Sequence, residues 1–214
     1  MAGRLAECRI FLAEFRRNFR TTGAILPSGR RLSTALAHFV RDGSSPGPRR
    51  ILEVGPGTGA VTRHLVRNLR PGDRLDLVEL NQSFVDCLND RFRTDPAFQP
   101  AADRARVLHC PVEDLPTDAP YDVIVSGLPL NNFAVAEVEH ILSVLRRLAA
   151  PRATLSFFEY MAIRRFKATV SGRAERNRLR GIAQVVGRLL TEGEIRRDWI
   201  WPNVPPAWVH HVRL

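Results

Sequence analysis

Three glycines close to one another stand where a polar ligand could bind. The segment ILEVGPGTGAVTRHL, residues 51–65, passes from an apolar run into a turn with Gly55, Gly57 and Gly59, and then into a helix-like pattern. Such a turn lets the backbone approach a ligand, and the helix that follows offers free N–H groups. Turns also use glycine for purely structural reasons, so this motif alone leaves a ligand site and an ordinary turn equally open.

A carboxylate on the next apolar run favours a ligand. The segment LDLVEL contains Glu79, which follows Gly59 by 20 residues. An acid at the end of the second strand, near this spacing, can accept both hydrogen bonds from a ribose diol. A solvated loop glutamate is the alternative for Glu79 alone. The two features together favour a cofactor that contains ribose.

Alternating strands and helices must position these residues. Because parallel strands need crossover helices, this alternation predicts an α/β fold with a Rossmann-like, doubly wound, mostly parallel sheet of seven strands. We expect strands at 51–54, 74–79, 107–110, 121–125, 154–158, 195–201 and 208–214, and helices at 4–20, 31–40, 61–69, 83–92, 134–148 and 176–190. We divide the chain into N-terminal helices at 1–48 and a main domain at 49–214.

The composition excludes several other classes of protein. The chain has 214 residues, of which 44% are hydrophobic, and no apolar run approaches the roughly 20 residues that span a bilayer. The charged N-terminus lacks the apolar core of a secretory signal, so we expect none. The three cysteines and six histidines show no metal-ligand spacing, and we expect no metal.

Positive charge is concentrated at both ends of the chain. The net charge is +10, yet residues 32–160 hold fourteen basic and sixteen acidic residues. Residues 1–31 hold seven basic and two acidic residues, and residues 161–214 hold eleven and four. Basic ends indicate an anionic partner, either nucleic acid or an anionic membrane surface. A GC-rich genome is a simple alternative explanation for the many arginines.

The N-terminal helix has the pattern of an interfacial helix. Its apolar residues recur at steps of three and four, and arginines flank that face. Such a helix can lie in a membrane interface, although packing on the core is the alternative. The basic segment 163–180 also suits an anionic lipid surface, with RNA left open. The candidate membrane or substrate contacts in these two segments are Phe15, Arg16, Arg17, Phe19, Arg164 and Arg165.

The motifs of the core resemble a known family. EVGPGTG resembles motif I of class I S-adenosylmethionine-dependent methyltransferases, and VEL resembles their ribose-binding acid. The resemblance covers residues 51–158 and implies S-adenosylmethionine as cofactor, with S-adenosylhomocysteine as product. Glu53 would hold the methionine end of the cofactor. The remaining implied cofactor contacts are Val112, Glu113 and Asp114 beside the adenine, Asn81 and Gln82 on the adenine side, and Leu80 and Ser126 elsewhere.

The loop after the fourth strand bears on the methyl acceptor. Methyltransferases that act on planar nitrogens usually carry [ND]-P-P-[YF] or N-L-P-Y there, with an aromatic ring that stacks on the base. Here the stretch is SGLPLNNF, in which Ser126 and Leu130 replace the polar and aromatic residues. The loss of the ring argues against a flipped base, unless Phe133 or another residue supplies the stack.

The whole chain resembles bacterial phospholipid N-methyltransferases of the PmtA type, which are related to rRNA adenine dimethylases. This resemblance rests on FRRNFRTTGAILPSGRRLSTALA, SGLPLNNF, SFFEYMAIRR and NVPPAWVHHVRL. It implies stepwise N-methylation of phosphatidylethanolamine to phosphatidylcholine, by a peripheral enzyme on the inner face of the bacterial cytoplasmic membrane. We expect a monomer without a nucleic acid partner. The resemblance also implies that AILPSG covers the cofactor, with Ser28 near its carboxylate.

A lipid ammonium must lose a proton before it can attack a methyl group. The candidate base is Tyr160, which follows the fifth strand, with Glu159, His210 and His211 as further candidates. His210 is also a candidate substrate contact. Two alternatives remain: an rRNA adenine N6-dimethyltransferase-like enzyme, and a non-catalytic binding module that retains the cofactor fold.

Overall fold

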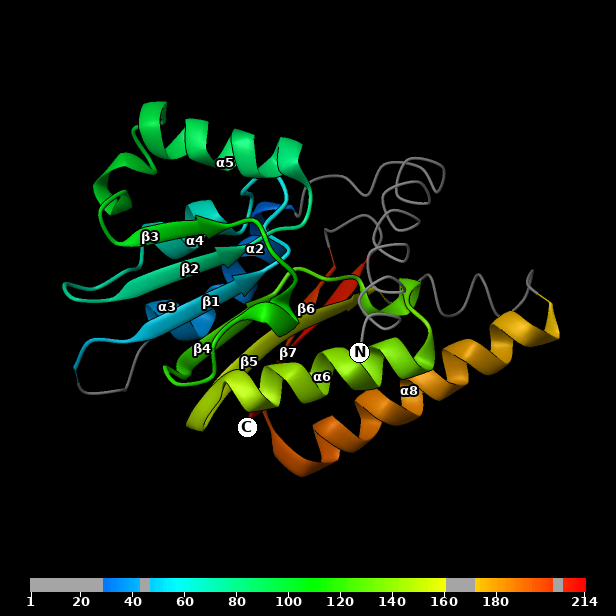
Figure 1. Ribbon diagram of the computed structural model, residues 1–214. Coiled ribbons are helices and arrows are strands. Elements are labelled where there is room, and N and C mark those ends of the chain that lie inside the picture. The colour runs from blue at the N-terminus through cyan, green and yellow to red at the C-terminus, as the bar shows by residue number, and fades with distance from the viewer. Residues whose placement is uncertain (1–28, 43–46, 161–171, 202–205) are drawn as a thin grey trace.

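Branched and aromatic runs form a central sheet of seven strands. The computed structural model describes residues 29–42, 47–160, 172–201 and 206–214. The strand order is β3-β2-β1-β4-β5-β7-β6, and helices cover both faces (Figure 1). The strands are β1 (Arg50–Val54), β2 (Arg74–Val78), β3 (Ala105–Leu108), β4 (Tyr121–Ser126), β5 (Ala149–Tyr160), β6 (Glu194–Ile200) and β7 (Ala207–Arg213).

The direction of the strands confirms the predicted doubly wound sheet. Strands β1 to β5 pair in parallel, whereas β7 is antiparallel to both β5 and β6. The α-helices are α2 (Arg30–Leu36), α3 (His38–Arg41), α4 (Thr62–Val66), α5 (Gln82–Thr94), α6 (Val135–Leu148) and α8 (Arg173–Gly193). Short 3₁₀ helices are η1 (Gln99–Ala101), η2 (Val112–Asp114) and η3 (Leu130–Asn132).

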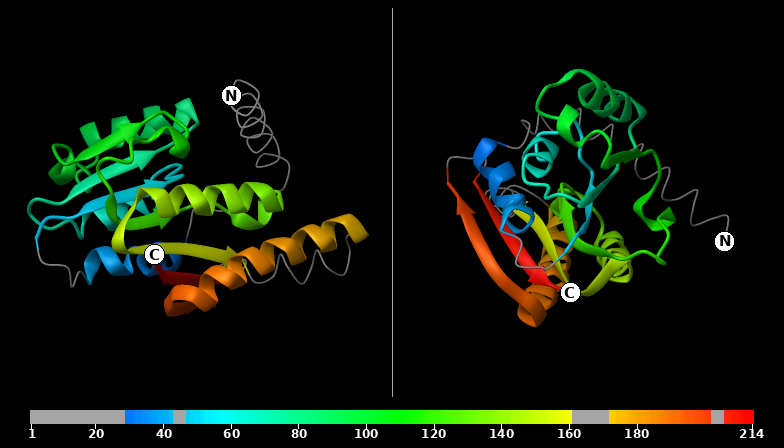
Figure 2. Two further views of the ribbon diagram at one scale, coloured as in Figure 1. Left: turned by 60° about the horizontal axis from the view of Figure 1, so that its bottom comes forward. Right: turned by 90° about the vertical axis from the view of Figure 1, so that its left-hand side faces the viewer.

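Two apolar layers hold the helices to the sheet. Alternate strand residues point to opposite faces, so Leu52 packs in the layer with α6 and α8, while Ile51 packs in the layer with α2, α3 and α4. Figure 2 shows the same two helical layers from other directions. Leu32, Leu36 and Val40 are fully buried, so α2 and α3 belong to the core of the sheet domain. The described helices before the predicted boundary at residue 48 therefore share one hydrophobic core with the sheet that follows it.

Several predicted elements differ in extent from those observed. The predicted helix 31–40 is divided at Ala37 into α2 and α3. Helix α4 ends at Val66, three residues before its predicted end, and β5 begins at Ala149 rather than Thr154. Strand β5 is long because it pairs with β4 on one side and with β7 on the other. The predicted helix 4–20 lies outside the described residues.

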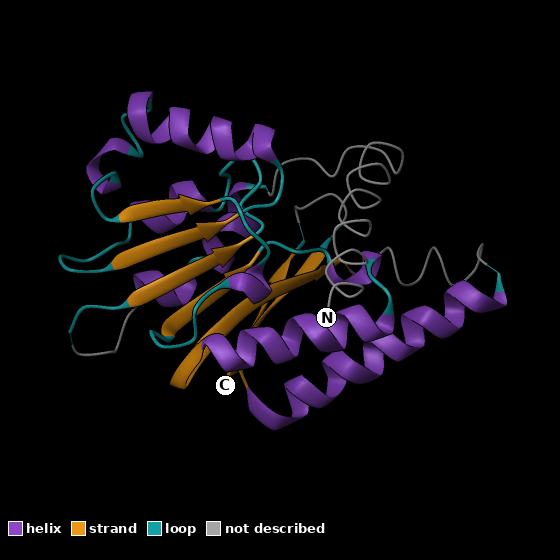
Figure 3. Cartoon of the chain, in the orientation of Figure 1, coloured by secondary structure: helices purple, strands orange, loops and turns teal. Residues whose placement is uncertain are grey.

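The topology brings the ends of the parallel strands together at one edge. Arrowheads of β1, β2, β3 and β4 point to the same side of the molecule (Figure 3). The chain runs outward from β1 to β2 and β3 in one direction and from β4 to β5 in the other, so the order reverses between β1 and β4. Ligands of open parallel sheets bind beyond the carboxyl ends of the strands at such a reversal. None of the described helices is long and apolar enough to cross a bilayer.

Candidate functional site

The glycine turn leaves the carboxyl end of β1 at this reversal point. Gly55 has φ of 70° and donates its N–H to the Val78 carbonyl at 3.0 Å. Gly57 has φ of 56°, and a Cβ placed there would meet nothing within 4 Å. L-residues with side chains rarely adopt these angles, and the space beside Gly57 is open. The turn therefore presents bare backbone to whatever occupies the crevice.

Glu79 faces the glycine turn from the end of β2. Its Oε2 accepts a hydrogen bond from the Gly57 N–H at 3.0 Å, and Oε1 accepts from the N–H groups of Leu80 and Asn81 at 2.9 Å each. Three backbone donors thus orient one carboxylate that is only 9% exposed. The two features singled out in the sequence are in direct contact. Oε2 keeps lone-pair capacity toward the crevice, as a ribose diol would require.

Glu53 supplies a second carboxyl group behind the turn. It is 1% exposed, and its Oε2 accepts a hydrogen bond from the Thr62 hydroxyl at 2.7 Å. Oε1 has no hydrogen-bond partner among the described residues. Burial raises the pKa of Glu53 to about 8, and the nearby charge of Glu79 adds to this shift. A buried acceptor without a partner fits the ammonium group of a bound amino acid moiety.

The adenine side of the crevice is built from the ends of β2 and β3. Val112 is buried at the start of η2 and packs in the apolar layer with α6 and α8. Leu80 and Glu113 are half-buried. The Asn81 Oδ1 accepts a hydrogen bond from the Ser83 N–H at 3.0 Å and so caps α5. The positions of these residues are compatible with their predicted contacts with the cofactor, which stay predictions.

The loop after β4 crosses close to the glycine turn. Ser126 is buried beside β1, and Gly127 donates its N–H to the Val54 carbonyl at 2.8 Å. A Cβ at Gly127 would lie 2.5 Å from the Gly55 carbonyl oxygen, so only glycine fits. Leu128 lies against Gly55. The loop after β4 therefore packs against the glycine turn through backbone and one aliphatic side chain.

The aromatic residue of that loop points into the core. Leu130 and Phe133 are each 2% exposed and pack in the layer with α6 and α8. Arg178 of α8 donates hydrogen bonds to the carbonyls of Phe133 and Asn131, which fixes the loop. Phe133 therefore does not supply the stacking ring that a flipped base requires.

Tyr160 ends β5 at the carboxyl edge of the sheet. It is 3% exposed and packs against Phe158, with ring centroids 4.9 Å apart. Burial raises the pKa of Tyr160 to about 12, so the phenol keeps its proton at neutral pH. This chemistry suits a group that orients an amine better than a group that takes its proton.

The two histidines of β7 point to opposite faces of the sheet, as predicted. His210 is 3% exposed, with Nδ1 2.6 Å from Glu194 Oε1 and Nε2 3.4 Å from Glu159 Oε2. Such burial does not fit direct membrane contact, and a role toward the substrate would run through Glu159. His211 lies on the other face, with Nδ1 2.7 Å from the Ser156 hydroxyl.

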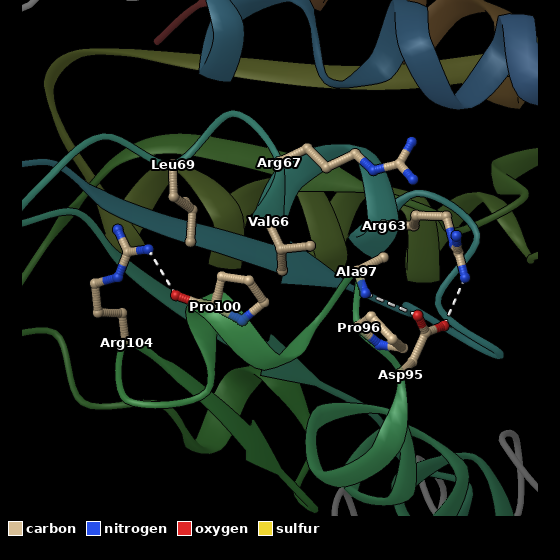
Figure 4. A pocket seen from close by; sticks show the side chains of 9 residues that line it. All are labelled: Arg63, Val66, Arg67, Leu69, Asp95, Pro96, Ala97, Pro100 and Arg104. Atoms are coloured by element: carbon tan, nitrogen blue, oxygen red, sulfur yellow. Dashed lines mark hydrogen bonds and ion pairs between the residues drawn. The ribbon is translucent and has the colours of Figure 1, made fainter.

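Other predicted contacts lie outside the described residues: Ser28, Phe15, Arg16, Arg17, Phe19, Arg164 and Arg165. A separate surface hollow lies between α4 and the segment after α5 (Figure 4). It contains none of the predicted site residues, and its Arg63 is already paired with Asp95 at 2.5 Å. We therefore place the candidate site at the glycine turn.

Two residues of the site were not singled out in the sequence. Thr62 orients Glu53, and Gly127 allows β4 to approach the glycine turn. A hydroxyl on the helix that follows the turn and a glycine directly after Ser126 were the available signals. Neither is specific without the sheet order, because many helices and loops contain such residues.

Comparison with known proteins agrees with this geometry. Residues 51–152 match the family described as "Methyltransferase domain". The chain is similar to that family over these residues, which are just under half of its length. The matched range contains the glycine turn, Glu79 and the loop after β4, while α8, β6 and β7 lie beyond it.

Two curated relatives are similar to different parts of the chain. The ornithine lipid N-methyltransferase of Singulisphaera acidiphila is 25% identical over 147 residues, 69% of this chain and 74% of that protein. The ribosomal RNA small subunit methyltransferase A of Parasynechococcus marenigrum is 37% identical over 82 residues, 38% of this chain. The match spans only 26% of that rRNA methyltransferase.

Solved structures confirm the fold class. An O-methyltransferase from Bacillus cereus in complex with S-adenosylhomocysteine superposes with a TM-score of 0.66 at 16% identity, over 94% of this chain and 88% of that one. This superposition confirms the class I methyltransferase fold predicted from the sequence. The predicted cofactor, S-adenosylmethionine, agrees with the domain match and with the arrangement of Glu53, Gly57 and Glu79.

Proposed function

We propose that this protein N-methylates phosphatidylethanolamine, and its mono- and dimethyl forms, toward phosphatidylcholine at a membrane surface. The proposal joins the methyltransferase domain with the resemblance of the whole chain to PmtA-type phospholipid N-methyltransferases. Its similarity to an ornithine lipid N-methyltransferase over 69% of its length supports an amine on a lipid as the acceptor. We place the enzyme on the inner face of the bacterial cytoplasmic membrane, as a peripheral monomer.

One observation carries the choice of acceptor. The loop after β4 offers the described part of the site no aromatic face, because Leu130 replaces the usual ring and Phe133 is buried in the core. A flipped base held between side chains depends on such stacking. An aliphatic amine has no π-face and does not need a ring. The site therefore favours a lipid amine over a nucleobase.

The residues of the site have defined roles toward the cofactor. When bound, S-adenosylmethionine supplies an electrophilic methyl group on a sulfonium. Glu79 would accept hydrogen bonds from the ribose, and the Oε1 of Glu53 would accept one from the amino group of the methionine moiety. The open backbone at Gly57 lets the nucleoside lie against the turn. These contacts position the reacting carbon for in-line attack, which is where much of the acceleration of methyl transfer arises.

Removal of the ammonium proton is the second requirement. Tyr160, with a pKa of about 12, would orient the amine by hydrogen bonding and leave the proton to another acceptor. Glu159, the preceding residue of β5, points to the opposite face of the sheet, where it is 7% exposed and lies 3.4 Å from His210. Tyr160 and the Glu159–His210 pair are therefore alternatives for an amine on one face or the other, and do not act together on one amine.

An RNA adenine N6-methyltransferase is the second candidate. The local identity of 37% to an rRNA methyltransferase and the net charge of +10 favour it. The missing ring after β4 opposes it, because dimethylation of adenine requires the base to be held out of its stack.

A direct competition assay tests the proposal. Purified protein and labelled S-adenosylmethionine are offered phosphatidylethanolamine vesicles, ornithine lipid vesicles and ribosomal RNA in one series, and the lipid products are resolved. We expect label in mono-, di- and trimethylated phosphatidylethanolamine. Label in RNA alone would end the lipid proposal, and label in ornithine lipid alone would move it to that substrate.

A further inference from the structure

The large apolar side chains that the described residues expose all belong to one edge of the sheet. Ile195, Trp199 and Trp201 are 43%, 48% and 62% exposed, and they lie on β6 and directly after it. Scattered apolar side chains on a surface need no explanation, whereas a group on an edge strand marks an interaction surface. The β6 edge is such a surface.

The tryptophans of this edge form an ordered row. Trp199 pairs with Trp208 across the ladder, with ring centroids 5.1 Å apart and 25° between planes. Trp201 stacks on Trp199 at 4.8 Å and 29°. The guanidinium of Arg197 lies 5.5 Å from the centre of the Trp208 ring. We name Trp201, Trp199 and Trp208 the tryptophan row, and the mutual stacking means that it is formed before any partner binds.

The row lies at the same end of the sheet as the candidate site. Ile200 pairs with Ala207, which pairs with Tyr160, the last residue of β5. Strand β6 runs parallel to β5, so Trp201, which directly follows β6, lies at the carboxyl end of the parallel strands. Gly57 and Glu79 lie at the same end of the sheet. A surface touching the row would lie beside the edge at which a methyl acceptor must enter.

Positive charge lies beside the row. Arg197 is on the same face of β6 as Trp199 and its side chain is 47% exposed, whereas its partner Glu194 is only 19% exposed. Arg196, which pairs with Asp198, points to the opposite face of the strand. The Arg197 guanidinium thus faces outward and its carboxylate partner lies inward. Helix α8 also extends past the end of β5 at this edge (Figure 1), and its first turns expose Arg173 and Arg180. This arrangement complements a surface of phosphates.

We propose that the tryptophan row is a contact with the headgroup interface of a phospholipid bilayer. Indole prefers this interface because its ring is apolar and its N–H remains hydrogen-bonded, and arginines beside it can reach lipid phosphates. Stacking among the rings uses most of their faces, which leaves little for RNA bases. This inference rests on the proposed function. The contact would hold the end of the sheet at which the methyl acceptor enters against the lipid headgroups.

The tryptophan content of the chain makes the test direct. The sequence contains three tryptophans, all in the row, so intrinsic indole fluorescence reports on this surface alone. The full-length protein is mixed with vesicles of phosphatidylethanolamine and phosphatidylglycerol, with or without brominated acyl chains. We expect a blue shift on binding and quenching by the brominated lipid. No shift and no quenching while the protein co-sediments with vesicles would overturn the contact.

Variants connect the contact to catalysis. The double variant Trp199→Ala/Trp201→Ala should bind these vesicles roughly tenfold more weakly, since two partly exposed indoles are lost. The matched control is Ile195→Ala, near the opposite end of β6, which removes an exposed apolar side chain outside the tryptophan row and should bind within about twofold of the native protein. Unchanged cofactor affinity shows that both variants fold, and equal vesicle binding by the double variant and the control contradicts the contact.

A water-soluble short-chain phosphatidylethanolamine separates this inference from the proposed function. We expect the double variant to methylate that monomeric lipid at the native rate but vesicle lipid more slowly. If the native protein methylates neither lipid, the proposed function is wrong. The fluorescence quenching experiment then tests the membrane contact by itself.

Two results would assign the tryptophan row to another partner. The double variant could dissociate a native dimer, or it could lose affinity for RNA, in either case without a change in quenching by brominated lipid. Either result would contradict the membrane contact.

Discussion

At the scale of single residues, the site is a pair of carboxyl groups with different surroundings. Glu79 is oriented by three backbone N–H groups, whereas Glu53 has one hydroxyl donor and is fully enclosed. The glycine turn connects them, because its backbone contacts Glu79 and leaves the space beside Gly57 open. One carboxylate is thereby presented for hydrogen bonding, and the other, whose pKa burial raises to about 8, is enclosed with one oxygen that lacks a hydrogen-bond partner among the described residues.

The variant Glu79→Ala should bind S-adenosylmethionine about 10- to 100-fold more weakly, because two ribose hydrogen bonds worth about 1 kcal/mol each are lost. Isothermal titration calorimetry measures this change. Asp86→Ala, which removes an exposed carboxylate from α5, is the matched control and should leave the affinity unchanged. Equal dissociation constants for native protein and Glu79→Ala would exclude the ribose role.

Glu53 should make the cofactor-free protein less stable as the pH rises. The pKa of Glu53 is about 8 in the folded chain against 4.5 as its ordinary value, so between these values the folded state binds the extra proton. The free energy of unfolding therefore falls by up to about 5 kcal/mol across this window. Urea denaturation of native protein and Glu53→Gln at pH 5 and pH 8 measures the difference, and identical slopes with pH would show that the carboxyl is not so perturbed.

At the scale of elements, the β6–β7 hairpin extends the sheet and is held by His211. Its Nε2 lies 3.2 Å from Asp198 Oδ2 and its Nδ1 2.7 Å from the Ser156 hydroxyl, so one imidazole joins β5, β6 and β7. The order serine, histidine, aspartate resembles a catalytic triad, but Ser156 is fully buried and no substrate can reach it. The arrangement is structural, and it sets the position of the tryptophan row.

Acid should weaken this junction. Burial lowers the pKa of His211 to about 4, below its ordinary 6.5, so the unfolded chain binds a proton in this range that the folded chain does not. Stability contributed by the neutral ring is present above pH 6.5 and is lost as the pH falls toward 4, by roughly 3 kcal/mol. Thermal unfolding of native protein and His211→Gln at pH 7 and pH 4.5 tests this sign. The exposed His140→Gln is the control, and an equal loss in all three proteins would contradict the role of His211.

At the scale of the whole molecule, the net charge of +10 predicts salt-dependent membrane binding. Added salt screens the attraction between basic residues and anionic headgroups over about 10 Å at 0.1 M ionic strength, whereas indole insertion is hardly affected. Vesicle co-sedimentation from low to high salt should show a steep loss of binding to phosphatidylglycerol vesicles and a shallow loss for zwitterionic phosphatidylcholine vesicles. Parallel salt dependences for both vesicle types would show that charge does not direct the binding.

The fold could be predicted to a large extent because its determinants are local. Alternating apolar runs and helical periodicity along residues 51–158 specify crossover connections, and these specify a parallel sheet. Element ends were harder to predict, as β5 shows, since pairing of Ala149 with Tyr121 of β4 moves its start ahead of the predicted Thr154 and no local pattern encodes that partner. The buried ion pair of Arg49 with Asp73, at 2.6 Å, was missed for the same reason.

The sequence by itself determined that a glycine turn and a strand-end carboxylate meet, because covalent order and strand direction place both at one edge. Only the tertiary structure decided which side chains face the crevice and which are buried. It removed Phe133 and His211 from the site, gave Tyr160 its raised pKa, and assembled three tryptophans from two strands into one row. The reason is physical: burial and stacking depend on neighbours brought close by sheet order, and such neighbours lie far apart along the chain.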